Sequence, residues 1–189
     1  MSTRIRKPQG KMRKAPKQER SRDTVDTILE ATAHILARKG WGGLTTNEVA
    51  QVAGVSIGSL YQYFPSKLAL IEAVRNRHFQ DILDLLRAAT DVERLVQGMI
   101  DLHSRHPAIH HVLMEESPRS RDWKAEEEAF EMEYLRLYEA LISGGKMAAQ
   151  VASAAIAGVV HDAARRGTLA SPALKRELVR MISSVANRS

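Results

Sequence analysis

The stretch LTTNEVAQVAGVSIGSLYQYFPSK, residues 44–67, contains the local signals that decide the fold. Thr45 and Glu48 form the T-x-x-E pattern of a capping box, in which a threonine side chain and a glutamate side chain satisfy the first amides of a helix. This pattern predicts a short helix over residues 46–53. Gly54 comes next, and glycine readily adopts the left-handed conformation that ends a helix and begins a tight turn.

A second short helix is predicted directly after this turn. Ser56 is a good N-cap for a helix over residues 57–63, and Pro65 prevents that helix from continuing. Ser66 then caps a longer helix, predicted over residues 67–88. Two short helices joined by a glycine-containing turn are typical of a helix-turn-helix motif.

The rest of the chain also shows helical periodicity, with apolar residues recurring at steps of three and four. The remaining predicted helices cover residues 23–39, 91–104, 107–116, 120–142, 146–166 and 172–187. We find no stretch with the alternation of a strand and no internal repeat. The sequence therefore predicts an all-α protein, with three short helices followed by longer ones.

The positive charge is concentrated at the N-terminus. Residues 1–22 carry nine Lys or Arg and one acidic residue, a net +8, whereas the whole 189-residue chain carries +6, so the remainder is −2. Such a segment cannot bury enough apolar surface to fold alone. We interpret residues 1–21 as a flexible arm that attracts nucleic-acid phosphates, and the alternative is a solubilising tail.

Composition excludes several kinds of site. The chain has no cysteine, which rules out disulfides, thiolate metal sites and cysteine nucleophiles, and suits a reducing cytosol. No apolar segment follows the basic N-terminus, so we expect no signal peptide. The apolar run VASAAIAGVV, residues 151–160, is broken by Ser153 and Gly158, and we expect it to be too short to span a membrane.

The second short helix has the side chains of a recognition helix. Serine and glutamine can hydrogen-bond to base edges, isoleucine can touch a thymine methyl group, and tyrosine hydroxyls can bind phosphates. Glycine in a helix costs about 1 kcal/mol relative to alanine, a cost that suits close approach of the backbone to DNA. The alternative is that Tyr61 and Tyr63 are half-buried packing residues. The residues expected to face DNA are Ile57, Gly58, Ser59, Tyr61, Gln62 and Tyr63.

Lys67 stands at the first position of the following helix, where a cation opposes the helix dipole. The free amides at such a position form an anion site, and a DNA phosphate would make the lysine favourable. The alternative is a solvated lysine. Ser56 is expected to cap its helix and to touch a phosphate as well.

The run GWGGLTTNEVAQVAGVSIGSLYQYFPSKLAL closely resembles the DNA-binding domain of TetR-family (tetracycline-repressor-like) transcriptional regulators, over about residues 22–70. Its L-Y-x-Y-F-x-S-K ending is highly specific. The resemblance implies an all-α homodimer with an N-terminal DNA-binding domain, residues 22–68, and a C-terminal effector-binding and dimerisation domain, residues 69–189. It also implies operator contacts from Thr45, Thr46, the six residues of the recognition helix and Lys67.

Beyond residue 69 the resemblance is weaker and concerns the fold. The last two predicted helices are rich in small and aliphatic residues, which suits either a four-helix dimer interface or an intramolecular core; the resemblance favours the dimer. A small-molecule effector would need apolar walls with a few polar groups. The expected ligand-binding residues are Phe79, Met99, His103, Met114, Trp123, Phe130, Tyr134 and His161.

Four histidines lie within nine residues: His103, His106, His110 and His111. Some are spaced to share a helix face, so a metal site is conceivable. However, Pro107 interrupts the segment, and adjacent histidines point in different directions. We expect polar caps and hydrogen-bonded histidines here, with no metal and no cofactor.

Three functions remain after this reading. The first is a cytoplasmic, ligand-responsive repressor that binds a palindromic operator as a dimer. The second is a sequence-neutral, architectural DNA-binding protein that uses the basic arm. The third is a small-molecule enzyme on a helical scaffold, although the chain has no P-loop, G-x-S-x-G or HExxH motif.

Overall fold

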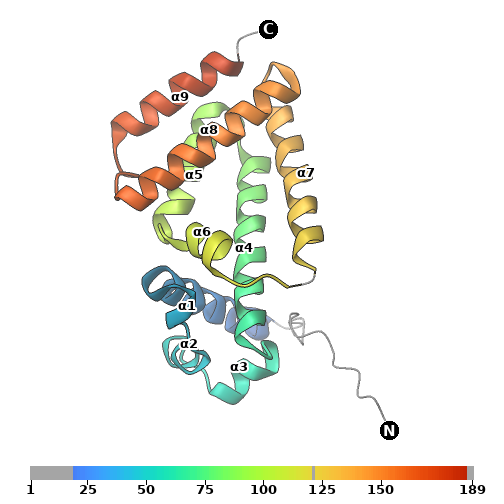
Figure 1. The fold of residues 1–189 in the computed structure, drawn as a ribbon, viewed down its shortest axis with the longest axis vertical. Coiled ribbons are helices and arrows are strands. Elements are labelled where there is room, and N and C mark those ends of the chain that lie inside the picture. The colour runs from blue at the N-terminus through green and yellow to red at the C-terminus, as the bar shows by residue number, and fades with distance from the viewer. Residues whose placement is uncertain (1–18, 121, 187–189) are drawn as a thin grey trace. The chain divides into compact units, whose positions relative to one another are not determined.

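The computed structural model describes residues 19–120 and 122–186, so most of the basic arm predicted for residues 1–21 lies outside the described residues. The described residues fold into helices joined by short loops, without a strand (Figure 1). The prediction of an all-α fold is confirmed.

The described chain forms two compact units. The first comprises residues 19–77 and 111–120, and the second comprises residues 78–110 and 122–186. Helix α4, Lys67–Ala88, continues from the first unit into the second. This division differs from the one expected at residue 68, because the first unit takes in a segment that is distant in the sequence.

The first unit is built from α1 (Glu19–Gly43), α2 (Thr46–Val52), α3 (Ile57–Tyr63) and the start of α4. Each helix contributes apolar side chains to one small core. Those exposed by at most 2% are Ile28, Ile35, Leu36, Leu44, Val49, Leu60, Phe64, Ala69, Leu70, Ile71 and Leu113.

Helix α1 is longer than predicted, but the predicted stop is present within it. Gly40 has φ 66° and ψ −177°, which interrupts the helix before one further turn brings the chain to Gly43. The left-handed φ explains why glycine occupies this position. The predicted end of this helix at residue 39 is therefore confirmed, with a short turn added after Gly40.

The helix predicted over residues 107–116 is wrong as a single helix. The chain instead forms a short turn, α6 (Ile109–His111), followed by a π-helical turn, η1 (Val112–Glu116). Arg75 of α4 explains this arrangement. Its side chain is fully buried and donates to the carbonyl oxygen of Leu113 from Nε and Nη2, at 3.2 and 3.0 Å. Hydrogen bonds to Ser117 Oγ and the Pro118 carbonyl oxygen complete the anchor.

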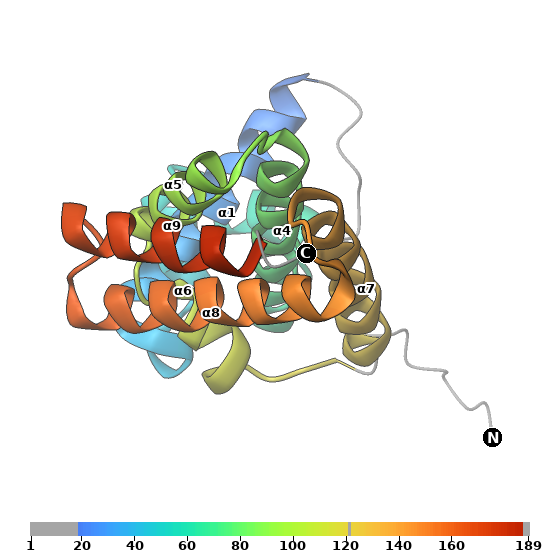
Figure 2. The same ribbon diagram turned by 90° about the horizontal axis from the view of Figure 1, so that it is seen from above.

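The second unit contains the end of α4, α5 (Val92–Arg105), α6 up to residue 110, α7 (Trp123–Leu141), α8 (Gly145–Arg166) and α9 (Pro172–Ala186). Helices α8 and α9 lie side by side and antiparallel (Figure 2), and α8 also packs against α5 and α7. The core between these helices is aliphatic and includes Leu95, Val96, Ala149, Ala152, Ile156, Val160 and Ile182.

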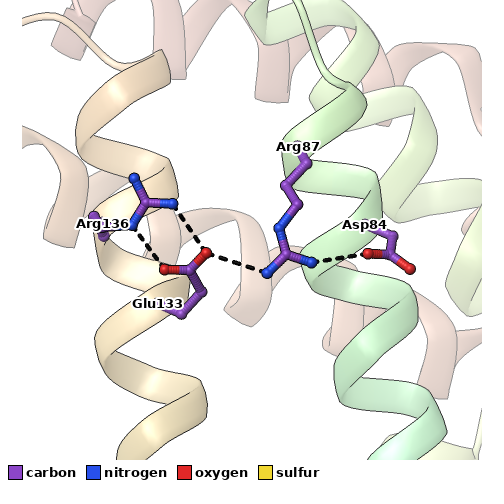
Figure 3. A network of polar contacts seen from close by, with 4 residues as sticks. All are labelled: Asp84, Arg87, Glu133 and Arg136. Atoms are coloured by element: carbon purple, nitrogen blue, oxygen red, sulfur yellow. Dashed lines mark hydrogen bonds and ion pairs between the residues drawn. The ribbon is translucent and has the colours of Figure 1, made fainter.

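A polar network joins α4 to α7 at the surface of this unit (Figure 3). Glu133 accepts hydrogen bonds from Arg136 on its own helix, at 2.7 and 2.9 Å, and from Arg87 of α4 at 3.1 Å. Arg87 also pairs with Asp84 at 2.9 Å. Arg136 and then Arg87 lower the pKa of the Glu133 carboxyl to about 2.

Helix α8 contains the apolar run that we expected to be too short for a membrane. It has 22 residues and contains an 18-residue window with a mean hydropathy of 1.2, so it is the one helix in the described chain long and apolar enough to cross a bilayer by length and composition. This is weak evidence for a membrane span, since the core helix of a soluble protein meets the same criterion, and the expectation for residues 151–160 is not contradicted. Its packing against three neighbouring helices accounts for the apolar residues in another way.

Candidate helix-turn-helix interface

The two short helices of the first unit begin with the predicted caps. Thr45 Oγ1 accepts from the Glu48 amide at 3.2 Å, and Ser56 Oγ accepts from the Ser59 amide at 3.0 Å. The carboxylate of Glu48 pairs with Lys39 at 2.7 Å, so the reciprocal half of the expected capping box is replaced by a bridge to α1. Both cap predictions are confirmed, and this bridge ties α2 to its neighbour.

The turn between α2 and α3 also has the expected geometry. Gly54 has φ 66°, and the Val55 amide donates back to the carbonyl oxygen of Ala50 at 3.0 Å. Ala50 is 4% exposed. The turn thus holds α3 at a fixed angle on α2, since both its conformation and its hydrogen bond are specified locally.

Helix α3 divides into a buried face and an exposed face. Leu60 and the adjoining Phe64 are fully buried. Ile57 and Tyr61 are 39% and 42% exposed, which is high for large apolar side chains. Gly58 and Gln62 are exposed as well, whereas Ser59 and Tyr63 are partly buried. The alternative that Tyr61 is a packing residue is thereby weakened.

Several of the residues predicted to contact DNA hydrogen-bond to one another. The hydroxyls of Tyr61 and Thr46 lie 3.1 Å apart, so the end of α3 meets the start of α2. The hydroxyls of Ser56 and Ser59 lie 2.8 Å apart. These contacts orient polar groups on one surface before any partner is bound. Tyr63 instead reaches α1, where its hydroxyl donates to Ser21 Oγ at 3.4 Å.

Lys67 is neither a solvated lysine nor a free anion site. Its ammonium donates to the carbonyl oxygen of Trp41 at 2.6 Å and lies 4.0 Å from the centre of the Trp41 ring. Partial burial lowers the pKa of Lys67. The carbonyl and the ring together offset the unfavourable interaction of the lysine with the helix dipole at the start of α4. The sequence analysis did not identify Trp41 as the partner of Lys67.

The predicted ligand-binding residues form two groups in the second unit. The first is aromatic: Phe79 of α4 stacks on Phe130 of α7 with ring centres 4.0 Å apart, and Trp123 lies 5.7 Å from Phe79. Tyr134 continues the row at 5.3 Å from Phe130, and burial raises its pKa. Sequence reasoning missed Tyr138, whose ring lies 4.8 Å from Tyr134.

The second group consists of histidines. His103 Nε2 lies 3.1 Å from His161 Nε2, so the structure brings together two residues that the sequence reading placed in the ligand site. His78 and His110 join them, with ring centres 5.6 and 6.1 Å from that of His103. Met99 supports this group through its carbonyl oxygen, which lies 2.8 Å from His103 Nδ1.

Burial favours the neutral form of three imidazoles in this group, because it lowers the pKa of His78, His103 and His161. It lowers the pKa of His78 to about 3 and that of His161 to about 4, and neighbouring imidazoles contribute in the same direction. His78 was not singled out in the sequence, because no other histidine lies within twenty residues of it. Only its position on α4, beside α5, makes it part of the group.

Three residues that the sequence analysis considered lie outside the aromatic group and the histidine group. Met114 is in η1 and belongs to the first unit, so the structure does not group it with the other ligand-site candidates. His111 is exposed and lies 3.6 Å from Glu116. His106 is the C-cap of α5 and belongs to the second unit.

A capped helix, a left-handed glycine and a second helix with an exposed polar face define the helix-turn-helix class of DNA-binding proteins. Two family models match the chain: "Bacterial regulatory proteins, tetR family" over residues 28–74, and "Tetracyclin repressor-like, C-terminal domain" over residues 89–184. The chain therefore belongs to the tetR family of bacterial regulatory proteins.

Similar curated proteins match mainly over part of their length. The transcriptional repressor KstR of Mycolicibacterium smegmatis is 38% identical over 80 residues, which are 42% of this chain and 37% of that protein. The nucleoid occlusion factor SlmA of Actinobacillus pleuropneumoniae is 27% identical over 114 residues, 56% of this chain and 55% of that protein. The chain thus spans about two fifths to a little over half of these relatives.

Solved structures match over nearly the whole chain. The fatty acid degradation regulator FadR of Bacillus halodurans has a TM-score of 0.70 at 17% identity and covers 92% of this chain and 98% of that one. NalD, the secondary repressor of an efflux pump in Pseudomonas aeruginosa, has a TM-score of 0.64 at 21% identity, with coverages of 90% and 99%. At these identities the likeness shows the fold alone.

Proposed function

We propose that this protein is a ligand-responsive transcriptional repressor that binds a palindromic operator as a homodimer in the cytoplasm. The observation that carries the proposal is the exposed face of α3. Ile57 and Tyr61 are each exposed by about two fifths, while Leu60 on the opposite side is fully buried. A surface helix with no partner would not need large apolar groups directed at solvent, whereas a helix in the major groove uses them to contact bases.

The DNA contacts that we propose come from three places. The N-terminal residues of α3, including Ile57, Gly58 and Ser59, would reach base edges. Thr45, Thr46 and the two tyrosines of α3 would bind the flanking phosphates through their hydroxyls, with Ser56 and Gln62 beside them. Lys67 would add a phosphate contact from the start of α4, sharing its ammonium between Trp41 and the DNA.

The second unit would bind the effector. The row of Phe79, Trp123, Phe130 and Tyr134 offers aromatic surface for an apolar ligand, and His103 and His161 offer polar groups beside it. An effector releases DNA when it binds more tightly to a conformation in which the two recognition helices are wrongly spaced for the operator. Differential affinity for the two conformations is the only driving force required.

The homodimer would form through α8 and α9. Much of the aliphatic surface of these helices is buried against other helices of the same chain. This burial supports, for part of the surface, the alternative that these residues form an intramolecular core. A separate stripe on α8 remains exposed: Met147, Val151, Ala154 and Gly158 follow one another at steps of four, three and four. A side chain at Gly158 would meet nothing within 4 Å, so this face is open to close approach by a second copy.

The relatives are named for different functions. KstR and NalD are named as repressors and FadR as a regulator, whereas SlmA is named as a nucleoid occlusion factor. The family match favours a regulator over both other hypotheses, the sequence-neutral architectural DNA-binding protein and the small-molecule enzyme.

A competition experiment separates the first two functions. The labelled DNA would carry an inverted repeat from the region upstream of the gene, and the competitor would be random DNA of equal length at physiological salt. A repressor should prefer the repeat by about 10³-fold or more. A preference below about tenfold would contradict the repressor proposal and favour the architectural protein.

A further inference from the structure

The second unit contains a cluster of four histidines, contributed by four different helices: His78 of α4, His103 of α5, His110 of α6 and His161 of α8. One potential ligand nitrogen from each of His78, His103 and His110 lies within 4.8 Å of the others. His161 lies beside them, with its ring stacked on that of His110 at 3.6 Å.

Two nitrogen–nitrogen distances in the cluster suit a tetrahedral ion. Zinc–nitrogen bonds of about 2.0–2.1 Å at tetrahedral angles separate two ligand nitrogens by roughly 3.3 Å. His78 Nε2 and His110 Nδ1 are 3.4 Å apart, and His103 Nε2 and His161 Nε2 are 3.1 Å apart. Two of the edges of such a coordination sphere are thus already close to the length that the ion requires.

The orientation of His103 is fixed in the form that binds metal. Its Nδ1 lies 2.8 Å from the carbonyl oxygen of Met99. A carbonyl oxygen can only accept, so Nδ1 must carry the hydrogen, and the lone pair of the neutral ring is then on Nε2. This backbone support is typical of metal-binding histidines, in which the second nitrogen holds the ring in place. The supported Nε2 is the atom that faces His161.

Packing alone does not explain the cluster. An aliphatic core residue needs no polar partner, whereas every buried imidazole must satisfy two nitrogens. His78 and His103 are exposed by only 7% and 3%. Imidazoles could pair in hydrogen bonds, His78 with His110 and His103 with His161, but each pair must then have one donor and one acceptor. An ion accepts a lone pair from each neutral ring and satisfies the group at once.

We propose that His78, His103 and His110, with His161 as a fourth ligand, bind one divalent transition-metal ion of the zinc class. Imidazole ligands suit zinc, cobalt, nickel and copper and do not suit magnesium or calcium. The proposal does not depend on DNA binding, because the four residues lie in the second unit and α2 and α3 belong to the first. It shares His103 and His161 with the proposed effector site.

The test measures metal binding by the full chain after removal of metals with a chelator. Titration with Zn²⁺ by calorimetry, and with Co²⁺ by absorption spectroscopy, should give one ion per chain and the intense visible bands of tetrahedral cobalt. His103→Gln and His161→Gln should each weaken binding by at least about tenfold. His106→Gln and His111→Gln are the matched controls, since they remove histidines outside the cluster, and should leave the affinity unchanged.

Circular dichroism identifies variants that fail to fold. Should His103→Gln unfold, His161→Gln provides the comparison, because His161 is only partly buried. The proposal is overturned if the chain binds no stoichiometric Zn²⁺, if folded cluster variants bind as tightly as the original chain, or if the control variants lose the ion. None of these measurements uses DNA, so they can fail while the repressor proposal stands.

Discussion

Within α3, some residues are needed for folding and others are proposed to contact DNA. Leu60 is fully buried and holds the helix in place, whereas Gly58, two residues earlier, has no such role. A Cβ added at Gly58 would meet only Ser56 Oγ, at 3.8 Å, which is ordinary contact. Packing within the protein therefore does not require glycine at this position. A DNA molecule that approaches the backbone closely would require it.

Gly58→Ala should accordingly stabilise the protein and weaken DNA binding. Alanine is favoured over glycine within a helix by about 0.5–1 kcal/mol, and the added methyl group would occupy space that we assign to the DNA. Denaturation with urea measures the free energy of unfolding, and fluorescence anisotropy with operator DNA measures the affinity. Unchanged affinity in the stabilised variant would contradict close approach at Gly58.

Gly54→Ala is the matched control for this experiment. Gly54 has φ 66°, and a Cβ there would meet nothing within 4 Å, so backbone strain is the only cost. Alanine in the left-handed region should destabilise the protein by about 1–2 kcal/mol. The same substitution thus has opposite effects on stability at two glycines four residues apart.

Lys67→Ala tests the proposed phosphate contact. Loss of one phosphate contact should weaken binding to all DNA sequences alike and reduce the slope of log affinity against log salt by about one. Lys124→Ala, on α7 in the second unit, is the control, and its slope should match that of the original chain. An unchanged slope for Lys67→Ala would mean that the lysine serves only to hold Trp41.

At the scale of helices, most of the fold is predictable because its boundaries are set by nearby residues. The caps at Thr45, Ser56 and Ser66 and the glycine at residue 54 act within three or four residues of themselves, and the structure has α2, α3 and α4 close to where these signals place them. Local signals fail at η1. Its π-helical turn depends on Arg75, which is 38 residues away from Leu113.

The candidate sites divide in the same way. The α3 face follows from helical periodicity, so the exposed and buried residues are predictable from the sequence. The histidine cluster is not, because His78 and His161 come from helices distant in the sequence, and their meeting depends on packing among α4, α5 and α8. Met114, also predicted for the ligand site, lies in the first unit, although His110, four residues earlier, belongs to the second.

The contact between α4 and α7 gives a pH-dependent prediction. The pKa of Glu133 is lowered to about 2, so its ion pairs stabilise the fold above the ordinary pKa of a glutamate, about 4.3, and lose that effect as the pH falls through about 2. Glu133→Gln should therefore lower the melting temperature slightly at pH 7, and the difference should shrink as the pH falls and disappear below about pH 2. The pairs are close to solvent, so the effect should also shrink at high salt.

Glu131→Gln serves as the control, because Glu131 is exposed on the same helix. Its melting temperature should follow that of the original chain at both pH values. Equal melting temperatures for Glu133→Gln and the original chain at pH 7 and low salt would show that the network in Figure 3 adds nothing to stability.

For the whole molecule, the proposed dimer is the property on which operator binding would depend. Two recognition helices about 34–36 Å apart match successive major grooves, and a single copy provides only one. Val151 is 46% exposed on α8, at the centre of the proposed interface stripe. A charged residue there would be buried without a partner in the dimer.

Val151→Glu should consequently produce a folded monomer that has lost most of its operator affinity. Sedimentation equilibrium measures the mass, and circular dichroism verifies the fold. Met132→Glu is the control, because Met132 is an apolar residue of α7 with 70% exposure and lies outside the stripe. A dimeric Val151→Glu would place the interface elsewhere.

The anchor formed by Arg75 limits how this protein can be recombined with its relatives. Residues 111–120 belong to the same compact unit as α1, α2 and α3, although more than thirty residues of the other unit separate them in the chain. A truncation after Arg77 would leave a buried guanidinium without the carbonyls of Leu113 and Pro118. A chimera that exchanges the first unit with that of a relative should therefore carry over both of its segments, residues 19–77 and residues 111–120, because the unit is discontinuous in the chain.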